Sequence, residues 1–156
     1  MLRPDHRALV LAFALAGTVE ARAQLTITEF PVPTPNSRPY TIVPGPDGNL
    51  WFTESNGNKI GRITPAGAIS EFAVPTGQSA PYGIAVGPDG NIWFTERFGN
   101  KIGRFSPASG QFSEFPIPTG NSQPWEIALG PDGNLWFTEE DAKKKVSTWD
   151  GTLTRS

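Results

Sequence analysis

The hydrophobic and polar positions of this chain repeat at a fixed interval. The ten residues GPDGNxWFTE, with Leu or Ile at x, occur at residues 45–54, 87–96 and 130–139. The period of about 42 residues is typical of arrays in which each unit is one supersecondary module. The unit of the fold is therefore one repeat.

Each copy predicts a tight turn that leads into a short strand. The residues Pro-Asp-Gly-Asn favour turn dihedral angles, and the β-branched and aromatic residues that follow favour a strand. Because side chains alternate between the two faces of a strand, Trp93 and Thr95 share one face. Ile92, Phe94 and Glu96 share the other. Large apolar residues on both faces predict a strand that is covered on both sides.

Three more strands are predicted in each unit. A small apolar segment precedes the turn in all three units. In the first two units an Asn-Lys-Ile-Gly-Arg segment follows the second strand and a Glu-Phe segment rich in proline ends the unit, whereas the third unit departs from this pattern at residues 140–149. In the first two units these segments are residues 38–43, 58–63 and 70–75, then 80–86, 100–105 and 113–118. Four short antiparallel strands per unit predict an all-β chain of β-propeller blades. A solenoid is the competing interpretation, whereas frequent Gly and Pro exclude helical repeats.

The repeat divides the chain into three blades at about residues 36–76, 78–119 and 121–156. Residues 25–33 match the Glu-Phe segment and are predicted to be an outer strand that would close a ring. Closed rings have about four to eight blades, so three blades make an incomplete ring. We expect either a fragment of a longer protein or copies that associate into a homo-oligomer to complete the ring.

The N-terminus predicts export. Residues 1–23 combine a basic start, a short apolar run and an Ala-Arg-Ala cleavage pattern, which is typical of a secretory signal peptide. A periplasmic or extracellular location follows from this prediction. No second apolar run is long enough to span a membrane, so no membrane association is expected after the signal peptide is removed.

Composition narrows the classes of partner. The chain has 13 Lys and Arg against 15 Asp and Glu, a net charge of −2, and no cysteine. This balance gives no electrostatic reason to bind nucleic acid. A small molecule, a peptide or a protein remains as a possible ligand. Because the chain has no cysteine, its stability must come from packing and not from disulfides.

The segments PYGIA, GPDGNIWFTE, NKIGR and EFPIPT closely resemble the repeat of the virginiamycin B lyase (streptogramin lyase) family, which has NHL-like repeats. The resemblance covers residues 27–139. It implies a seven-bladed propeller, of which three blades are a little under half. It also implies a carbon–oxygen lyase that confers antibiotic resistance by opening cyclic depsipeptides of the streptogramin B type. The family uses elimination, a Mg²⁺ ion and a histidine.

The resemblance also assigns candidate site residues. The ligand-facing position of the family follows the proline of the inner strand, and a metal-binding glutamate lies fourteen residues later. The substrate-binding candidates are Tyr40, Tyr82 and Trp125, which would otherwise pack around the inner rim. The metal-binding candidates are Glu54, Glu96 and Glu139. Because a glutamate recurs in every blade, a structural role such as accepting hydrogen bonds from a neighbouring blade is the favoured interpretation.

The catalytic base of the family is absent from these positions. The single histidine, His6, lies in the predicted signal peptide, so no catalytic residue is assigned. Two functions are therefore predicted. The chain is a truncated lyase-like member that contributes a substrate-facing rim, with Mg²⁺ expected only through the resemblance. Alternatively, it is a non-catalytic exported module that binds a ligand or a protein.

Overall fold

The computed structural model describes residues 26–140 and the backbone of residues 145–149. These residues contain strands and turns without any helix, and the strands form three antiparallel sheets of four, four and three strands. None of the described segments is a helix able to cross a membrane. The all-β prediction is confirmed.

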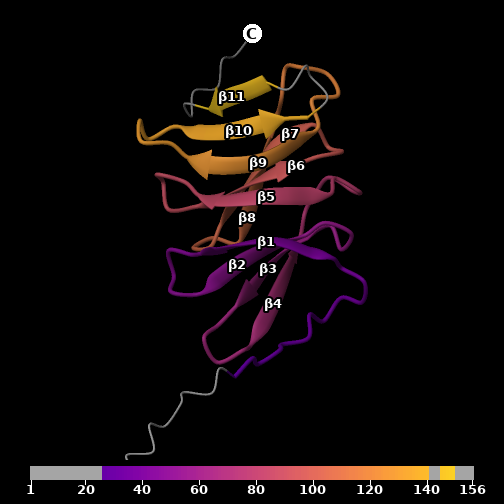
Figure 1. Cartoon of the computed structure of the whole chain (residues 1–156), viewed down its shortest axis with the longest axis vertical. Coiled ribbons are helices and arrows are strands. Elements are labelled where there is room, and N and C mark those ends of the chain that lie inside the picture. Colours follow the sequence, from indigo (N-terminus) through magenta and orange to yellow (C-terminus); the bar gives the residue numbers. More distant parts are fainter. Residues whose placement is uncertain (1–25, 141–144, 150–156) are drawn as a thin grey trace, which may run out of the picture.

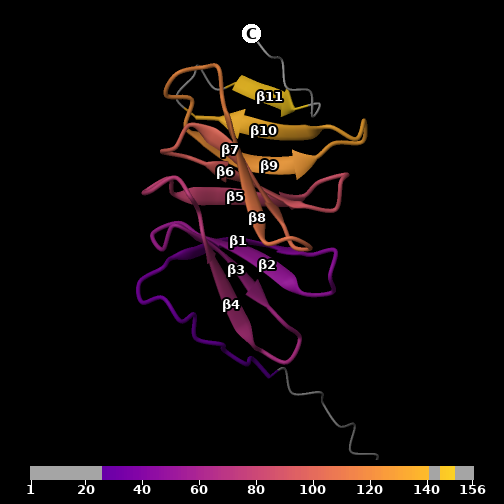
Figure 2. The same cartoon turned by 180° about the vertical axis from the view of Figure 1, so that it is seen from behind.

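Each sheet is a blade whose strands follow one another in sequence order. The strands of blade 1 are β1 (Pro39–Pro44), β2 (Leu50–Glu54), β3 (Lys59–Ile63) and β4 (Ile69–Ala73). Those of blade 2 are β5 (Pro81–Val86), β6 (Ile92–Glu96), β7 (Lys101–Ser106) and β8 (Gln111–Pro116). Those of blade 3 are β9 (Pro124–Leu129), β10 (Leu135–Glu139) and β11 (Lys145–Trp149). The three sheets are stacked, with inner strands β1, β5 and β9 next to one another (Figure 1 and Figure 2).

The four predicted strands per unit are present in blades 1 and 2. Residues 150–156, which end the predicted third blade, and the predicted signal peptide at residues 1–23 lie outside the described residues.

The outer strand predicted at residues 25–33 is not formed in the described residues 26–33. Pro31 and Pro33 cannot donate to a strand ladder, and the segment contacts blade 1 through its side chains instead. Phe30 lies against Gly67 in the turn before β4, and Thr34 donates from its backbone nitrogen and its hydroxyl to Glu71 at 2.9 and 2.8 Å.

The predicted Pro-Asp-Gly turns also fix the tryptophan that follows. In blade 2, Asp89 accepts hydrogen bonds from the Asn91 backbone at 3.1 Å and from the Trp93 indole nitrogen at 2.9 Å. Burial opposes ionisation of Asp89, but these bonds outweigh it and lower the carboxyl pKa. The indole lies directly over Gly87, where a Cβ would overlap it. The turn, glycine and tryptophan therefore form one packing unit that each blade repeats.

The hydrophobic core consists of two layers, each between two blades. The layer between blades 1 and 2 contains Trp51, Ile60, Val74, Ile84, Ile92, Phe94 and Phe105. The layer between blades 2 and 3 contains Ala85, Trp93, Ile102, Ile117, Ile127, Leu135 and Phe137. The predicted coverage of the second strand on both faces is confirmed for blade 2, where every residue of β6 is buried.

A buried threonine links each blade to the next. The Thr95 hydroxyl accepts a hydrogen bond from the Gly83 backbone at 2.9 Å and donates to the Trp125 carbonyl of blade 3 at 2.7 Å. Thr53 donates in the same way to the Tyr82 carbonyl at 2.7 Å. In both blades the first strand is irregular at this point, so the hydroxyl replaces a missing ladder bond. We call this contact the threonine bridge.

The threonine bridge predicts that a Thr→Val substitution lowers the free energy of unfolding at Thr95 more than at Thr138. Thr95→Val leaves the buried Gly83 nitrogen and Trp125 carbonyl without a partner, so we expect a loss of about 1–3 kcal/mol in the free energy of unfolding. Thr138→Val is the matched control, because Thr138 holds the same position in blade 3 and is exposed. Urea unfolding in dilute solution measures both. Equal effects of the two changes would contradict the bridge.

Close packing of aromatic rings on glycine predicts a second effect. A Cβ at Gly103 would overlap the Phe94 ring, whereas a Cβ at Gly120 meets nothing within 4 Å. We expect Gly103→Ala to destabilise the fold by about 1–3 kcal/mol through overpacking, and Gly120→Ala to be neutral or slightly stabilising. Thermal unfolding compares the two variants. An unchanged midpoint for Gly103→Ala would refute the tight ring contact.

Candidate functional site

The three predicted substrate-binding residues meet at one end of the inner strands. Tyr40, Tyr82 and Trp125 occupy the second positions of β1, β5 and β9, which lie next to one another. The ring centroids of Tyr40 and Tyr82 are 4.5 Å apart, those of Tyr82 and Trp125 4.7 Å, and those of Tyr40 and Trp125 5.9 Å. Tyr82 is buried between its neighbours, whereas Tyr40 is 41% exposed. We call these three residues the aromatic cluster.

A cation that the sequence analysis missed completes this cluster. The Arg97 guanidinium carbon lies 4.5 Å from the Trp125 ring centroid and 5.4 Å from that of Tyr82. Glu140 of blade 3 holds Arg97 through an ion pair of 2.7 Å. Blades 1 and 3 have Ser55 and Glu140 at the equivalent position, so the repeat gave no signal for an arginine here. A basic residue directly after the Thr-Glu pair was the one available hint.

The arrangement presents aromatic faces with an adjacent positive charge. Aromatic rings bind flat or apolar groups, and a cation held over them favours ligand groups with partial negative charge. The cluster is therefore suited to ligand binding.

The three candidate metal ligands are buried and remain separate. Glu54, Glu96 and Glu139 end the second strands of their blades and are 0%, 0% and 2% exposed. No group of three His, Cys, Asp or Glu residues able to hold a metal ion occurs within the described part of the chain. Both carboxyl oxygens of Glu54 and of Glu96 are inaccessible to solvent. Because Mg²⁺ normally keeps several water ligands, these side chains do not fit a magnesium site.

The repeat in the sequence favours a structural role for these glutamates, in which they would accept hydrogen bonds from a neighbouring blade. Neither oxygen of Glu54 or Glu96 forms a hydrogen bond of normal geometry within the described residues, and both carboxyls face small groups of their own blade. Glu54 lies near Ser37 and Gly57, and Glu96 lies near Ser79 and Gly99. The expected hydrogen bonds from a neighbouring blade's loop are not present for these two residues.

Burial raises the pKa of the Glu54 and Glu96 carboxyls. Desolvation, followed by the negative charge of Glu71, raises the pKa of Glu54 to about 7, against the opposing effects of Ser37 and Lys59. Desolvation, followed by the charge of Glu114, raises the pKa of Glu96 to about 7, against Lys101 and Ser79. Two neutral acids near pH 6 are therefore part of the folded core.

The fold and the cluster define the class of protein. Antiparallel blades that stack face to face, with aromatic side chains gathered on the inner strands, are typical of a β-propeller with a ligand-binding face. A family model described as "Virginiamycin B lyase family" matches residues 5–154. The chain therefore belongs to the virginiamycin B lyase family.

Individual relatives match different shares of the chain. Virginiamycin B lyase from Bordetella parapertussis is 50% identical over 46 residues, which are 30% of this chain and 15% of the relative. A crystal structure of virginiamycin B lyase from Staphylococcus aureus is 39% identical, covers 83% of this chain and 46% of its own chain, and has a TM-score of 0.71. A catalytically inactive variant of the same enzyme with Quinupristin gives 38% identity, 82% and 46% coverage and a TM-score of 0.71. The chain thus spans less than half the length of these relatives.

The raised pKa values predict a pH dependence of stability. Between the ordinary glutamate pKa of 4.5 and about 7, the folded state keeps protons on Glu54 and Glu96 that the unfolded state has released. Stability from these groups is therefore full below pH 4.5 and is lost as the pH rises to about 7. Because two carboxyls contribute, we expect the free energy of unfolding to fall by about 3–5 kcal/mol between pH 5 and pH 8.

The double variant Glu54→Gln, Glu96→Gln tests this dependence. It should lose most of the fall between pH 5 and pH 8 and be more stable than the parent at pH 8, as measured by urea unfolding at both pH values. Glu29→Gln is the control, because Glu29 is exposed in the N-terminal segment. A steep fall that persists in the double variant would assign the dependence to other groups.

Proposed function

We propose that this chain forms part of the ligand-binding face of a virginiamycin B lyase-type propeller and binds a streptogramin B-type cyclic depsipeptide without opening it. The observation that carries this proposal is the aromatic cluster. Three side chains, each about 42 residues from the next, converge beside Arg97 at the position where the family resemblance expects ligand contacts.

The cluster matches the chemistry of such a ligand. A cyclic depsipeptide presents apolar side chains together with flat amide and ester groups, whose carbonyl oxygens carry partial negative charge. Tyr40 and Trp125 offer partly exposed ring faces, and Arg97 offers a cation near those carbonyls. Ring stacking and a nearby cation are sufficient for binding and do not by themselves break a bond.

Ring opening by elimination needs a base that removes a proton next to the ester carbonyl. The only histidine of the chain is His6, which lies outside the described residues. Glu54 and Glu96 are neutral near pH 6 and inaccessible, so neither can reach a bound ligand. We therefore assign no catalytic or magnesium-dependent step to the described residues, and Mg²⁺ and export remain predictions.

The second candidate function is a non-catalytic exported propeller module for a different ligand or for a protein. The lack of a histidine among the described residues is equally compatible with this second function. It differs from the first candidate in ligand class, so a direct binding measurement separates them.

Isothermal titration calorimetry of the chain with quinupristin tests the proposal. Quinupristin is present in the crystal structure of the inactive Staphylococcus aureus relative. We expect saturable binding that Tyr40→Ala weakens about 2- to 10-fold, since an aromatic contact contributes about 0.5–1.5 kcal/mol beyond its buried area. Ile27→Ala is the matched control, because Ile27 is exposed and outside the cluster.

Mass spectrometry of the same mixtures gives the second readout. The proposal expects intact quinupristin after incubation with or without added Mg²⁺. Absence of binding would favour a different ligand, and a ring-opened product would show that the chain has a base of its own.

A further inference from the structure

The loop between β6 and β7 carries a side chain that its backbone does not require. In blade 1 the equivalent loop begins with Ser55, and in blade 2 it begins with Arg97. Both backbone nitrogens donate at 3.1 Å to the carbonyl of the residue just before the inner strand of their blade. The same backbone therefore forms with serine as with arginine, so the fold does not explain the cation of Arg97.

Glu140 occupies the same place in blade 3. Its backbone nitrogen donates at 3.2 Å to the carbonyl of Gln123, which stands just before β9. Its side chain reaches blade 2, where Oε2 accepts a hydrogen bond from Nη2 of Arg97 at 2.7 Å. Three successive blades thus carry an uncharged, a cationic and an anionic residue at one backbone position. We call the contact between Arg97 and Glu140 the inter-blade ion pair.

The inter-blade ion pair lies within the aromatic cluster. Three ring centroids are close enough to the Arg97 guanidinium carbon for cation–π attraction, at 4.5 Å for Trp125, 5.2 Å for Phe98 and 5.4 Å for Tyr82. The Arg97 side chain is 19% exposed, and that of Glu140 is 49% exposed. A ligand that contacts the Trp125 ring from the solvent therefore meets both charges together.

We propose that Glu140 determines the charge of the ligand group that the aromatic cluster accepts beside Arg97, favouring uncharged ester or amide carbonyls over carboxylates. The inference rests on the proposed function, since it concerns the same cluster and the same class of ligand. The backbone of a closed depsipeptide ring consists of ester and amide groups, whereas opening of the ester leaves a carboxylic acid. The inter-blade ion pair therefore distinguishes the closed ring from the opened acid.

The physical basis is the charge that a ligand group meets. A guanidinium without a partner binds a carboxylate through charge-assisted hydrogen bonds, which are about twice as strong as neutral ones. Because Glu140 already pairs with Arg97, a ligand carboxylate must displace Glu140 or lie beside a like charge, and both cost free energy. A carbonyl oxygen carries no net charge and needs only one further N–H donor of Arg97. It can therefore share Arg97 with Glu140.

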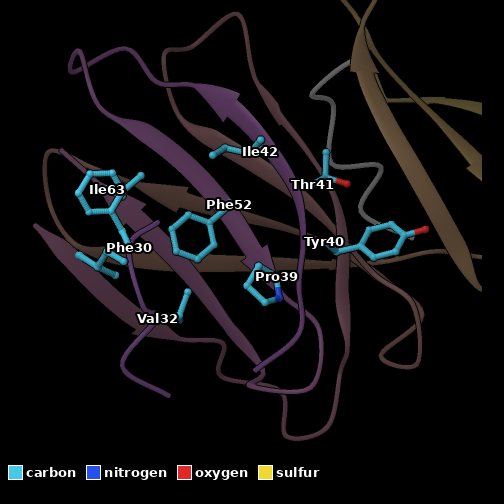
Figure 3. A pocket seen from close by; sticks show the side chains of 9 residues that line it. Phe30, Val32, Pro39, Tyr40, Thr41, Ile42, Phe52 and Ile63 are labelled. Carbon is cyan, nitrogen blue, oxygen red and sulfur yellow. The ribbon is translucent and has the colours of Figure 1, made fainter. Parts of the chain in front are cut away.

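A groove on blade 1 offers a different environment for an apolar ligand. It has a volume of about 320 Å³, and its lining, which includes Phe30, Val32 and Phe52, contains no charged side chain. Figure 3 shows that Tyr40 lies apart from these apolar side chains, with its hydroxyl pointing away from them. Binding in the groove would not depend on the charge at residue 140. A charge-dependent affinity therefore identifies the aromatic cluster as the binding site.

Calorimetry of the full chain with quinupristin, and with the linear acid that opening of its ester yields, tests the inference. In the parent chain the closed ring should bind more tightly than the acid. Glu140→Gln should strengthen binding of the acid about tenfold and change binding of the closed ring less than about threefold, because the freed guanidinium gains a carboxylate partner. Circular dichroism checks that this exposed substitution preserves the fold.

Glu29→Gln is the matched control, because it removes one carboxylate from the exposed N-terminal segment. It should leave the ratio of the two dissociation constants unchanged. The same unchanged ratio in Glu140→Gln would overturn the inference.

Quenching of tryptophan fluorescence gives a readout that needs no depsipeptide. Iodide is an anion and acrylamide is an uncharged amide, and both can reach the half-buried Trp125. At low ionic strength, Glu140→Gln should increase quenching by iodide about twofold, because the charge of Arg97 is then unpaired and weakly screened. Quenching by acrylamide should stay the same. The increase should vanish in a Trp125→Phe background.

The two readouts separate the charge selectivity from the proposed ligand. A rise in iodide quenching without any binding of quinupristin would reject the depsipeptide ligand and support the charge selectivity of the cluster. Equal iodide quenching of the parent and Glu140→Gln would refute that selectivity, even where quinupristin binds.

Discussion

Face-to-face packing between successive blades is the constraint on which the rest of this structure depends. A single short sheet cannot bury its side chains, and both core layers lie between sheets. Within a blade, large rings pack on glycines with no room for a Cβ, as Trp93 does on Gly87 and Phe94 on Gly103. The stability of one blade is therefore inseparable from the presence of its neighbours, as in other repeat proteins.

The same packing creates the candidate site. The threonine bridges join neighbouring inner strands at the point where each ladder is irregular. Because the strands are held together there, Tyr40, Tyr82 and Trp125 come into contact. The aromatic cluster thus arises from blade stacking, without a contiguous sequence motif that would form it. Ring opening by elimination would require a base in addition to stacked aromatic side chains. An array of similar blades can carry an aromatic cluster while the described residues contain no histidine.

The repeat tolerates a buried carboxyl group at the end of the second strand. Glu54 and Glu96 have the same inaccessible position at the end of the second strand, beside a serine and a glycine of their own blade. Burial of an ionised carboxylate without strong partners is costly, so the proton remains bound up to about pH 7. Recurrence in each blade, inaccessibility and separation together favour a role in the fold over metal binding.

The sequence by itself determined the period, the turns, the strands and their two covered faces, because these depend on neighbours within a few residues along the chain. It also located the three aromatic residues that meet. Residues 25–33 stay a prediction, because the blade that their strand would complete is not among the described residues. The sequence gave no signal for Arg97 over Trp125. Only the tertiary structure distinguished Trp93 from Trp136, or Thr95 from Thr138. These pairs have nearly identical local sequences and differ in whether another blade among the described residues covers them. Burial is a property of the neighbour across the junction, and repeated local sequence carries no information about which copy has one.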